Sequence, residues 1–269
     1  MRKKKNKIKP QFFYMIGDIH GNYKVVRDFW LRAKISEKMA EKDNVLICLG
    51  DFSANYFMNE RDKQFKEKLG KYPFTYFVIR GNHEERPSVM MSNNPSAWHY
   101  EGYQGGIVMV ENEYPYIKYA MDYPSLYVID GFKTLVLPGA YSVDKYRRLQ
   151  MGWSWFEGEQ MTVDEMLMGH HLVDAINYKC DLVLSHTCPT IYEPTDLFLS
   201  VVDQAMVDKS TERFLGDIEY KLDYRAWCWG HYHQHREYPS PDGRRRLMLM
   251  NEVVRLVDVL EEEGYVEVL

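Results

Sequence analysis

Short runs of apolar residues recur along the chain, and each ends abruptly in a polar cluster that contains or adjoins glycine. A short apolar run bounded by turn residues is typical of a buried strand. Runs of this kind predict the following strands: Phe12–Ile16, Val45–Leu49, Tyr76–Ile79, Leu182–Leu184 and Ala226–Trp229. We expect these strands to present the polar residues that follow them at one common end of the fold.

Helical segments separate the first three predicted strands. Tyr23–Ala33 and Glu60–Leu69 are long enough to be the crossover connections between parallel strands. The order of elements therefore predicts a layered α/β fold. Further along, Leu126–Asp130 and Thr134–Leu137 flank Gly131 as in a β-hairpin, which indicates a second portion of sheet.

The second half of the chain adds helices and another hairpin. Thr162 and Glu165 form a capping-box pattern, which predicts the start of a helix with a packing role. Thr211–Lys221 predicts another helix, and the residues around Pro241–Gly243 predict a hairpin. The last apolar blocks are expected to complete a sheet: Val253–Leu260 and Tyr265–Leu269.

The length and composition favour one large domain. The chain has 269 residues, of which 45% are hydrophobic, so it can bury a substantial core without disulfides or a structural metal. No linker rich in proline, glycine or serine and no repeat marks a boundary. We therefore predict a basic tail at residues 1–10 and a single domain at residues 11–269.

Charge and cysteine content exclude several classes of function. The net charge of −5 gives no overall basic field for nucleic acid or an anionic membrane. We interpret the basic residues at 2–9 and at Arg244–Arg246 as solvated charges, with nucleic-acid contact as the alternative. The four cysteines lack paired spacing, which predicts reduced thiols and a cytoplasmic protein. We expect neither a signal peptide nor a membrane helix.

Polar clusters with metal-binding and phosphate-binding chemistry follow the first three predicted strands. Asp18 and His20 are two residues apart, so both can face one ion in an extended loop, and Asp51 supplies another carboxylate. Asn82 and His83 place an amide oxygen and an imidazole beside the guanidinium of Arg80, whose paired N–H groups suit phosphate oxygens. Each cluster alone also fits an ordinary polar loop or helix cap.

Histidines extend this pattern into the second half of the chain. His186 and the pair His231 and His233 follow the last two of the predicted strands, and imidazole is a favoured ligand of transition metals. We interpret the remaining central and C-terminal histidines as structural: His99, His170, His171 and His235.

The ordered series from Gly17 to His233 resembles the calcineurin-like metallophosphoesterase superfamily. The motifs that carry the resemblance are G-D-x-H-G-N, G-D, R-G-N-H-E, S-H and G-H-x-H. The resemblance implies a four-layer α/β sandwich of two mixed sheets, with a dinuclear metal site at the carboxyl ends of the strands. The segment from Gly139 to Gln160 is similar to a bacterial and phage group of these enzymes.

The resemblance also implies a role for each candidate residue. One ion would be held by Asp18, His20, Asp51 and His233, and the other by Asp51, Asn82, His186 and His231, so that Asp51 bridges the pair. His83 corresponds to a proton-donating histidine. Arg80 matches an arginine of the protein-phosphatase branch, and Arg80, Asn82 and His83 are the expected substrate-binding residues.

These roles predict a metal-dependent phosphoester hydrolase. Two divalent ions lower the pKa of a shared water, giving a hydroxide that attacks phosphorus in line. Oxygen and nitrogen ligands without a thiolate suit manganese, iron, zinc, cobalt or nickel. Asp51 is followed by Phe52-Ser53-Ala54 and lacks the Asp-Arg-Gly run of phosphoserine and phosphothreonine phosphatases, which argues against that role.

The expected activity is that of a phosphomonoesterase acting on a phosphorylated small molecule, nucleotide or phosphopeptide. A phosphodiesterase or nuclease with the same centre is the alternative, and a non-catalytic protein-binding member of the fold is a further one. We expect substrate choice to depend on loops at Arg86–Tyr119 and Tyr141–Phe156, which are rich in Tyr, Trp and Met. Their aromatic side chains would stack on a substrate ring or fill space between sheet and helix.

Overall fold

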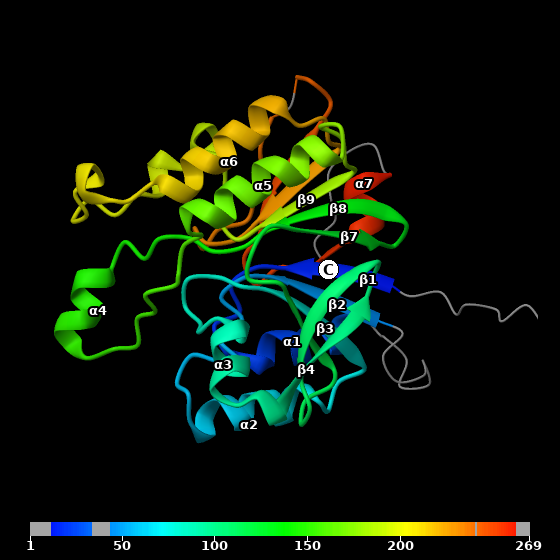
Figure 1. Cartoon of the computed structure of the whole chain (residues 1–269), viewed down its shortest axis with the longest axis vertical. Coiled ribbons are helices and arrows are strands. Elements are labelled where there is room, and N and C mark those ends of the chain that lie inside the picture. Colours follow the sequence, from blue (N-terminus) through cyan, green and yellow to red (C-terminus); the bar gives the residue numbers. More distant parts are fainter. Residues whose placement is uncertain (1–11, 34–43, 240, 262–269) are drawn as a thin grey trace, which may run out of the picture.

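Two mixed β-sheets stack face to face, and helices cover the outer face of each sheet (Figure 1). The structure is a computed structural model, and it describes residues 12–33, 44–239 and 241–261. The basic tail at residues 1–10 and the apolar block Tyr265–Leu269 lie outside these residues. The arrangement confirms the predicted four-layer α/β sandwich.

The first sheet has a parallel centre of four strands, three of which were predicted from the sequence. Its strand order is β13-β1-β2-β3-β6-β5-β4, in which β1, β2, β3 and β6 are parallel and the other strands pair antiparallel. The bounds of its strands are β1 Phe12–Ile16, β2 Asn44–Leu49, β3 Phe74–Ile79, β4 Trp98–Tyr103, β5 Gly106–Glu111, β6 Ile117–Ala120 and β13 Val254–Arg255.

The second sheet follows the same plan. Its order is β11-β12-β10-β9-β8-β7, with β8, β9, β10 and β12 parallel and a strand paired antiparallel at each edge. The bounds are β7 Ser125–Ile129, β8 Phe132–Leu137, β9 Leu182–Ser185, β10 Ala226–Trp229, β11 Arg236–Glu237 and β12 Arg245–Met248.

The helices are divided between the two outer faces. In Figure 1, α1, α2 and α3 lie against the first sheet, α5 and α6 lie against the second, and α4 projects to one side. Their bounds are α1 Tyr23–Arg32, α2 Glu60–Leu69, α3 Pro87–Asn93, α4 Lys145–Met151, α5 Val163–Ala175, α6 Ser210–Lys221 and α7 Leu256–Leu260. The predicted capping box at the start of α5 is present, because Thr162 and Glu165 cap each other's backbone N–H groups.

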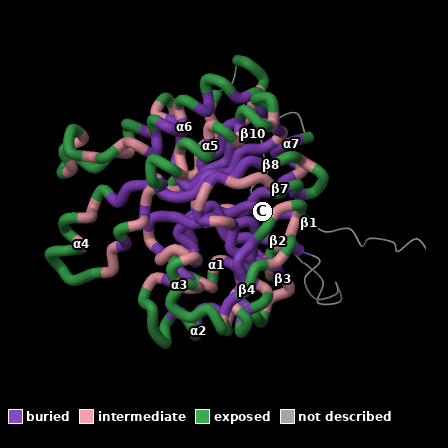
Figure 2. The backbone as a smooth tube through the Cα atoms, in the orientation of Figure 1, coloured by how far each residue is buried: buried purple, intermediate pink, exposed green. Residues whose placement is uncertain are grey.

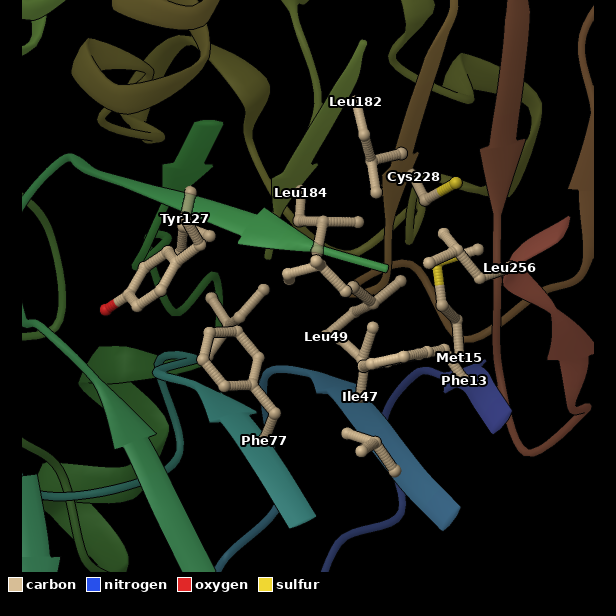
Figure 3. Close-up of a cluster of buried hydrophobic side chains, with 14 of the residues drawn as sticks. Phe13, Met15, Ile47, Leu49, Phe77, Tyr127, Leu182, Leu184, Cys228 and Leu256 are labelled. Carbon is tan, nitrogen blue, oxygen red and sulfur yellow. The ribbon is translucent and has the colours of Figure 1, made fainter. Parts of the chain in front are cut away.

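Alternating side chains divide the core into three apolar layers. In β2, Val45, Ile47 and Leu49 point between the two sheets, whereas Leu46 and Cys48 point toward the helices of the first sheet. The central layer joins both sheets, as Figure 3 shows for Ile47, Phe77 and Leu184, among others. Figure 2 shows the buried strands in the middle of the fold and the exposed helix faces outside.

One prediction about the edges of the fold was wrong, and another was correct only in part. Arg86–Tyr119 is not a loop at the site, because it forms α3 and most of the β4–β5–β6 meander at the edge of the first sheet. A two-residue turn with positive φ at Gln104 and Gly105 joins β4 to β5. Of the block Val253–Leu260, Val254–Arg255 pairs with β1, and the residues that follow form α7.

Other expectations can be compared directly with the structure. All four cysteines are free and buried. Arg246, in the second basic run, is buried and pairs with Glu219 and Asp242, so its charge is balanced within the fold and not solvated. In the ranges that the structure describes, no helix is long and apolar enough to cross a membrane.

Replacing a side chain of the central apolar layer should destabilise the whole domain. Ile47 is fully buried between the sheets, so we expect Ile47→Ala to lower the free energy of unfolding by about 2–5 kcal/mol in urea titrations. Ile107→Ala is the matched control, because Ile107 is 56% exposed, and it should change that free energy by less than about 1 kcal/mol. Equal effects of the two changes would contradict this description of the core.

Candidate metal centre

The predicted ligands lie in loops that follow parallel strands of both sheets. Asp18 and His20 follow β1, Asp51 follows β2, Asn82 follows β3, His186 follows β9, and His231 and His233 follow β10. The loops are tied together by hydrogen bonds. The His20 backbone N–H donates to the Asp51 carbonyl at 2.8 Å, and the His231 backbone N–H donates to the Asp18 carboxylate at 2.9 Å.

A first group of ligand atoms comes from Asp18, His20, Asp51 and His233. One potential ligand atom from each of these residues lies within 4.8 Å of the others. His20 Nε2 is 2.9 Å from His233 Nε2 and 3.9 Å from Asp51 Oδ2. Two carboxylates and two imidazoles therefore converge on one small volume, as binding of a single cation requires.

A second group lies on the other side of Asp51. His186 Nε2 is 2.8 Å from Asn82 Oδ1 and 3.4 Å from Asp51 Oδ1, and His231 Nδ1 is 3.1 Å from Asn82 Oδ1. The two oxygens of Asp51 thus face different groups, since Oδ2 is the oxygen near His20. The structure brings together all seven side chains that the sequence analysis selected as ligands.

The loops hold these side chains in an unfavourable backbone conformation. Asp18, His20, Asp51, His231 and His233 all have positive φ angles, between 45° and 71°. A non-glycine residue in this region costs of order 1–3 kcal/mol, and such residues cluster at functional sites. Five such residues around one centre indicate that the backbone adopts less stable conformations here, and that these conformations direct the side chains inward.

Hydrogen bonds outside the ligand groups fix the orientation of the ligand atoms. His186 Nδ1 lies 2.8 Å from the Leu49 carbonyl, so Nδ1 carries the proton there and Nε2 faces Asn82. The Asn82 amide N–H donates to Ser142 Oγ at 2.9 Å, and Ser142 in turn donates to Glu159 at 2.5 Å. These contacts leave the amide oxygen of Asn82 directed at the two histidines.

The electrostatics of the site suit a cation. Burial raises the pKa of Asp18 to about 8, and the neighbouring Asp51 charge adds to this effect against the opposing influence of His186. Burial also acts to raise the pKa of Asp51, but His186 and His83 outweigh it and hold the pKa well below its usual range. A bound divalent ion would stabilise both carboxylates in their ionised form.

The histidines are mostly available as neutral ligands. Burial lowers the pKa values of His20, His231 and His233, which favours the uncharged imidazole that metals bind. Burial acts in the same direction on His186, but Asp51 outweighs it and raises the pKa of His186 to about 9. A cation beside Asp51 would replace the proton in balancing that carboxylate. The donor set therefore fits divalent transition metals.

Two glycines leave the space that the ligands occupy. A Cβ on Gly81 would lie 2.2 Å from Asp51 Oδ1, and a Cβ on Gly50 would lie 2.1 Å from His186 Nδ1. Non-bonded atoms at these distances would overlap, so any residue larger than glycine would displace the ligand side chain. These close approaches explain why the motifs need glycine beside Asp51 and Asn82.

The structure places Arg80 away from the ligand groups. Its side chain is buried, and Nη1 donates to the backbone carbonyls of Gly158 and Glu159 at 3.0 Å and 2.6 Å. Nε lies 3.8 Å from the Asp122 carboxylate. These contacts tie the chain near residue 158 to β3, and they do not fit the catalytic and substrate-binding role predicted for Arg80.

Arg148 of α4 is the arginine that reaches the site. Its Nη2 lies 3.2 Å from His83 Nε2, while Nη1 donates to Tyr56 Oη at 2.9 Å and Nε donates to Asp144 at 2.7 Å. The sequence analysis did not select it, although the expected loop Tyr141–Phe156 contains it. Arg147 and Arg148 are adjacent on a short helix, and no sequence pattern distinguishes the arginine that faces His83.

Glu84 is the last residue of the R-G-N-H-E motif, and no role was predicted for it from the sequence. Its buried carboxylate accepts backbone N–H groups from Gly81 at 2.9 Å and Ser53 at 3.0 Å. It therefore joins the loop after β2 to the loop after β3. Burial raises the pKa of Glu84 to about 7, with hydrogen bonds from the backbone opposing the shift.

A Cβ at Gly81 should disrupt metal binding. Gly81→Ala would force Asp51 out of its position between the two ligand groups, so we expect the affinity for metal to fall by about 10–100-fold. Gly102→Ala is the control, because nothing lies within 4 Å of a Cβ there. Calorimetric titration with metal measures both. Unchanged stoichiometry and affinity in Gly81→Ala would contradict this arrangement of Asp51.

The solved structures that match this chain share little sequence with it. The protein TT1561 of Thermus thermophilus is 11% identical, with a TM-score of 0.50 over 97% of this chain and 98% of that chain. A dimetal phosphatase from Danio rerio is 11% identical, with a TM-score of 0.47 over 93% of each chain. An archaeal phosphodiesterase is 12% identical, with a TM-score of 0.37 over 96% of this chain and 99% of that chain.

The family comparison agrees with the geometry of the site. A search of curated protein sequences finds no match. The family model described as calcineurin-like phosphoesterase matches residues 13–235, which include both ligand groups and most of both sheets. The chain belongs to the calcineurin-like phosphoesterase family.

Proposed function

We propose that the protein is a phosphomonoesterase that uses two divalent metal ions bound around Asp51. The observation that carries the proposal is the buried position of Asp51, with one carboxylate oxygen toward each ligand group. His83 and Arg148 line the same pocket as Asn82, His231 and His233, so groups suited to a phosphate surround the centre. Manganese, iron, zinc, cobalt and nickel are all compatible with this donor set.

The residues around the centre divide the work of phosphoester hydrolysis. Two ions, when bound, would supply a nucleophile from water at neutral pH and neutralise charge on the phosphate. Asp18, His20, Asp51 and His233 would hold one ion, and Asp51, Asn82, His186 and His231 the other. The loops that carry them are fixed before the substrate arrives, which is the form of electrostatic stabilisation that phosphoryl transfer depends on.

The contacts of His83 support a role on the substrate and not as a metal ligand. Its backbone N–H donates to Asp51 Oδ1 at 2.9 Å, and its Nε2 lies 3.9 Å from Asp51 Oδ2. Burial, with help from Arg148, lowers the pKa of His83 to about 4 even though Asp51 opposes the shift. A bound phosphate dianion would favour the protonated imidazole, and we propose that His83 in this form hydrogen-bonds the phosphate and donates a proton to the oxygen of the departing alcohol.

Arg148 takes the phosphate-binding role that the sequence analysis gave to Arg80. Tyr56 and Asp144 hold its guanidinium, and the remaining Nη2 faces His83. A phosphate oxygen at this position would accept from Arg148 and from His83 together. A monoester dianion has more charge for these groups to balance than a diester does, which favours the phosphomonoesterase proposal.

The alternatives have less support. A nuclease or phosphodiesterase would use the same ligand groups, but the net charge of −5 gives no extended basic surface for a polyanion. A non-catalytic protein-binding role does not require these ligand groups, a half-buried histidine beside them and an arginine directed at that histidine.

Activity should depend on the metal and on Asp51. The purified protein should hydrolyse nitrophenyl phosphate faster than bis(nitrophenyl) phosphate, and only with a transition metal present. We expect Asp51→Asn to lose bound metal and at least about 100-fold in kcat/KM, because neither group keeps its shared ligand. His83→Ala should retain the metal, measured by elemental analysis, and lose about 10²–10⁴-fold in kcat.

The control for these changes is Asp28→Asn on the surface of α1, where the Asp28 side chain is 52% exposed and pairs with Arg27. It should retain both metal content and turnover. A metal-loaded protein that hydrolyses only the diester would contradict the monoesterase proposal. Full activity in Asp51→Asn with unchanged metal content would contradict the proposed centre itself.

Loss of Arg148 should weaken monoester hydrolysis selectively. We expect Arg148→Ala to lower kcat/KM for nitrophenyl phosphate by about 10²-fold, since it removes a charged hydrogen bond to the phosphate, with a smaller loss for the diester. Arg147→Ala is the matched control, because the adjacent Arg147 is exposed and lies 5.7 Å from the Trp153 ring. Similar kinetics for the two variants would exclude a substrate role for Arg148.

A further inference from the structure

The pocket at the candidate metal centre continues into an apolar lobe that the ligands do not use. The whole pocket has a volume of about 370 Å³. Asn82, His83, His231 and His233 line one part of it. The lobe is the part lined by apolar side chains of the segment 197–207: Leu197, Phe198, Leu199, Val202 and Val207.

Two segments outside the sandwich form the walls of this pocket. One is the chain from residue 141 to Arg148 in the middle of α4, and the other is the segment 190–209, which contains three short 3₁₀ turns. Figure 1 shows α4 in green and the segment around residue 200 in yellow, projecting on the same side of the molecule. Both segments start close to ligands, because Ser142 contacts Asn82 and residue 190 follows His186 by four positions.

Contacts with the rest of the fold hold the apolar wall in place. The Phe198 ring stacks on Tyr232 with centroids 6.5 Å apart, and Tyr232 lies between His231 and His233. Lys209 Nζ lies 4.8 Å from the Phe198 ring centroid and 2.9 Å from a Glu193 carboxylate oxygen. The lobe is therefore built before any ligand arrives, which lowers the entropic cost of binding.

Lys209, Glu193 and Glu212 also line the pocket, and each has a partner in the protein, although one oxygen of the buried Glu212 carboxylate lacks a hydrogen-bond partner among the described residues. Lys209 pairs with Glu193, and Glu212 accepts a hydrogen bond from Thr187 Oγ1 at 2.9 Å. What the lobe offers a ligand is mainly apolar surface. Leu199 is 58% exposed, and such an exposed apolar side chain beside a polar centre is typical of a binding site.

We propose that the lobe binds an apolar alcohol group of the substrate, so that the substrate class is small phosphate monoesters of apolar alcohols. This inference rests on the proposed function. The phosphate would lie at His83 and Arg148, and the alkyl or aryl group would extend along Phe198 and Val202. In hydrolysis, the water oxygen forms the new bond to phosphorus, the bond from phosphorus to the alcohol oxygen breaks, and that oxygen takes up a proton.

A pair of alkyl phosphates tests this substrate class without changing the chemistry of the leaving group. Octyl phosphate and ethyl phosphate both release a primary alcohol, so a difference in kcat/KM reports contacts with the chain. Each buried methylene contributes up to about fourfold. We expect kcat/KM of the metal-loaded protein to be about 100-fold higher for octyl phosphate than for ethyl phosphate. The measurement uses concentrations at which octyl phosphate does not aggregate.

Two adjacent valines provide a matched pair of variants. Val202 lines the lobe and is half-buried, whereas Val201 is 90% exposed and does not line it. Val202→Asn should reduce the preference for octyl phosphate to about 10-fold or less. Val201→Asn should leave both rates unchanged. Phe198→Ala is a second test, expected to act as Val202→Asn does.

Binding measurements separate failure of the lobe from failure of the proposed function. Octylphosphonate and ethylphosphonate cannot be hydrolysed at the bond in question, and calorimetry measures their affinities directly. If octylphosphonate binds more tightly than ethylphosphonate and Val202→Asn removes the difference, the result would support the lobe. If neither phosphate ester is hydrolysed in that case, the absence of hydrolysis would contradict the proposed function alone. Equal affinities for the two phosphonates, or measurable hydrolysis of the two phosphates with equal kcat/KM, would overturn the lobe as the site of the alcohol group.

Discussion

Burial of the Asp51 carboxylate is the constraint on which the rest of the site depends. A buried charge is costly unless it is paired and hydrogen-bonded. The fold provides the His83 backbone N–H at 2.9 Å and imidazoles on both sides, with His186 nearest. It also leaves no room for a side chain at Gly81, whose Cβ would contact Asp51. The ligand groups lie on opposite sides of Asp51, and the proposed pair of cations would complete this balance.

The two-sheet architecture makes this arrangement possible. Parallel strands of each sheet end on the same side, so loops from β1, β2, β3, β9 and β10 meet there although they are far apart in sequence. The apolar layer between the sheets fixes their separation and thereby the distance between the loops. Positive φ angles at five of the candidate ligands show that local backbone stability is given up for this convergence, and the three apolar layers offset its cost.

The substrate side of the pocket has a different origin. The candidate ligands lie directly after strands, whereas Arg148 and the apolar lobe belong to longer excursions between elements, at residues 141–156 and 190–209. Such segments are free to differ without disturbing the metal ligands, so the proposed chemistry and the choice of alcohol reside in separate parts of the chain. Their anchors are specific contacts: Tyr56 and Asp144 for Arg148, and Tyr232 and Lys209 for Phe198.

The sequence by itself determined the five strands that carry the candidate ligands, the helices between them and the choice of seven candidate ligand residues. It could do so because strand periodicity and strand-end motifs are local properties that short segments express. Only the tertiary structure decided that Arg86–Tyr119 extends a sheet, that Leu256–Leu260 is helical, and that Arg148 faces His83 while Arg80 is buried against Gly158 and Glu159. The direction of a long, flexible side chain depends on which distant backbone groups it meets, and no local pattern encodes those partners.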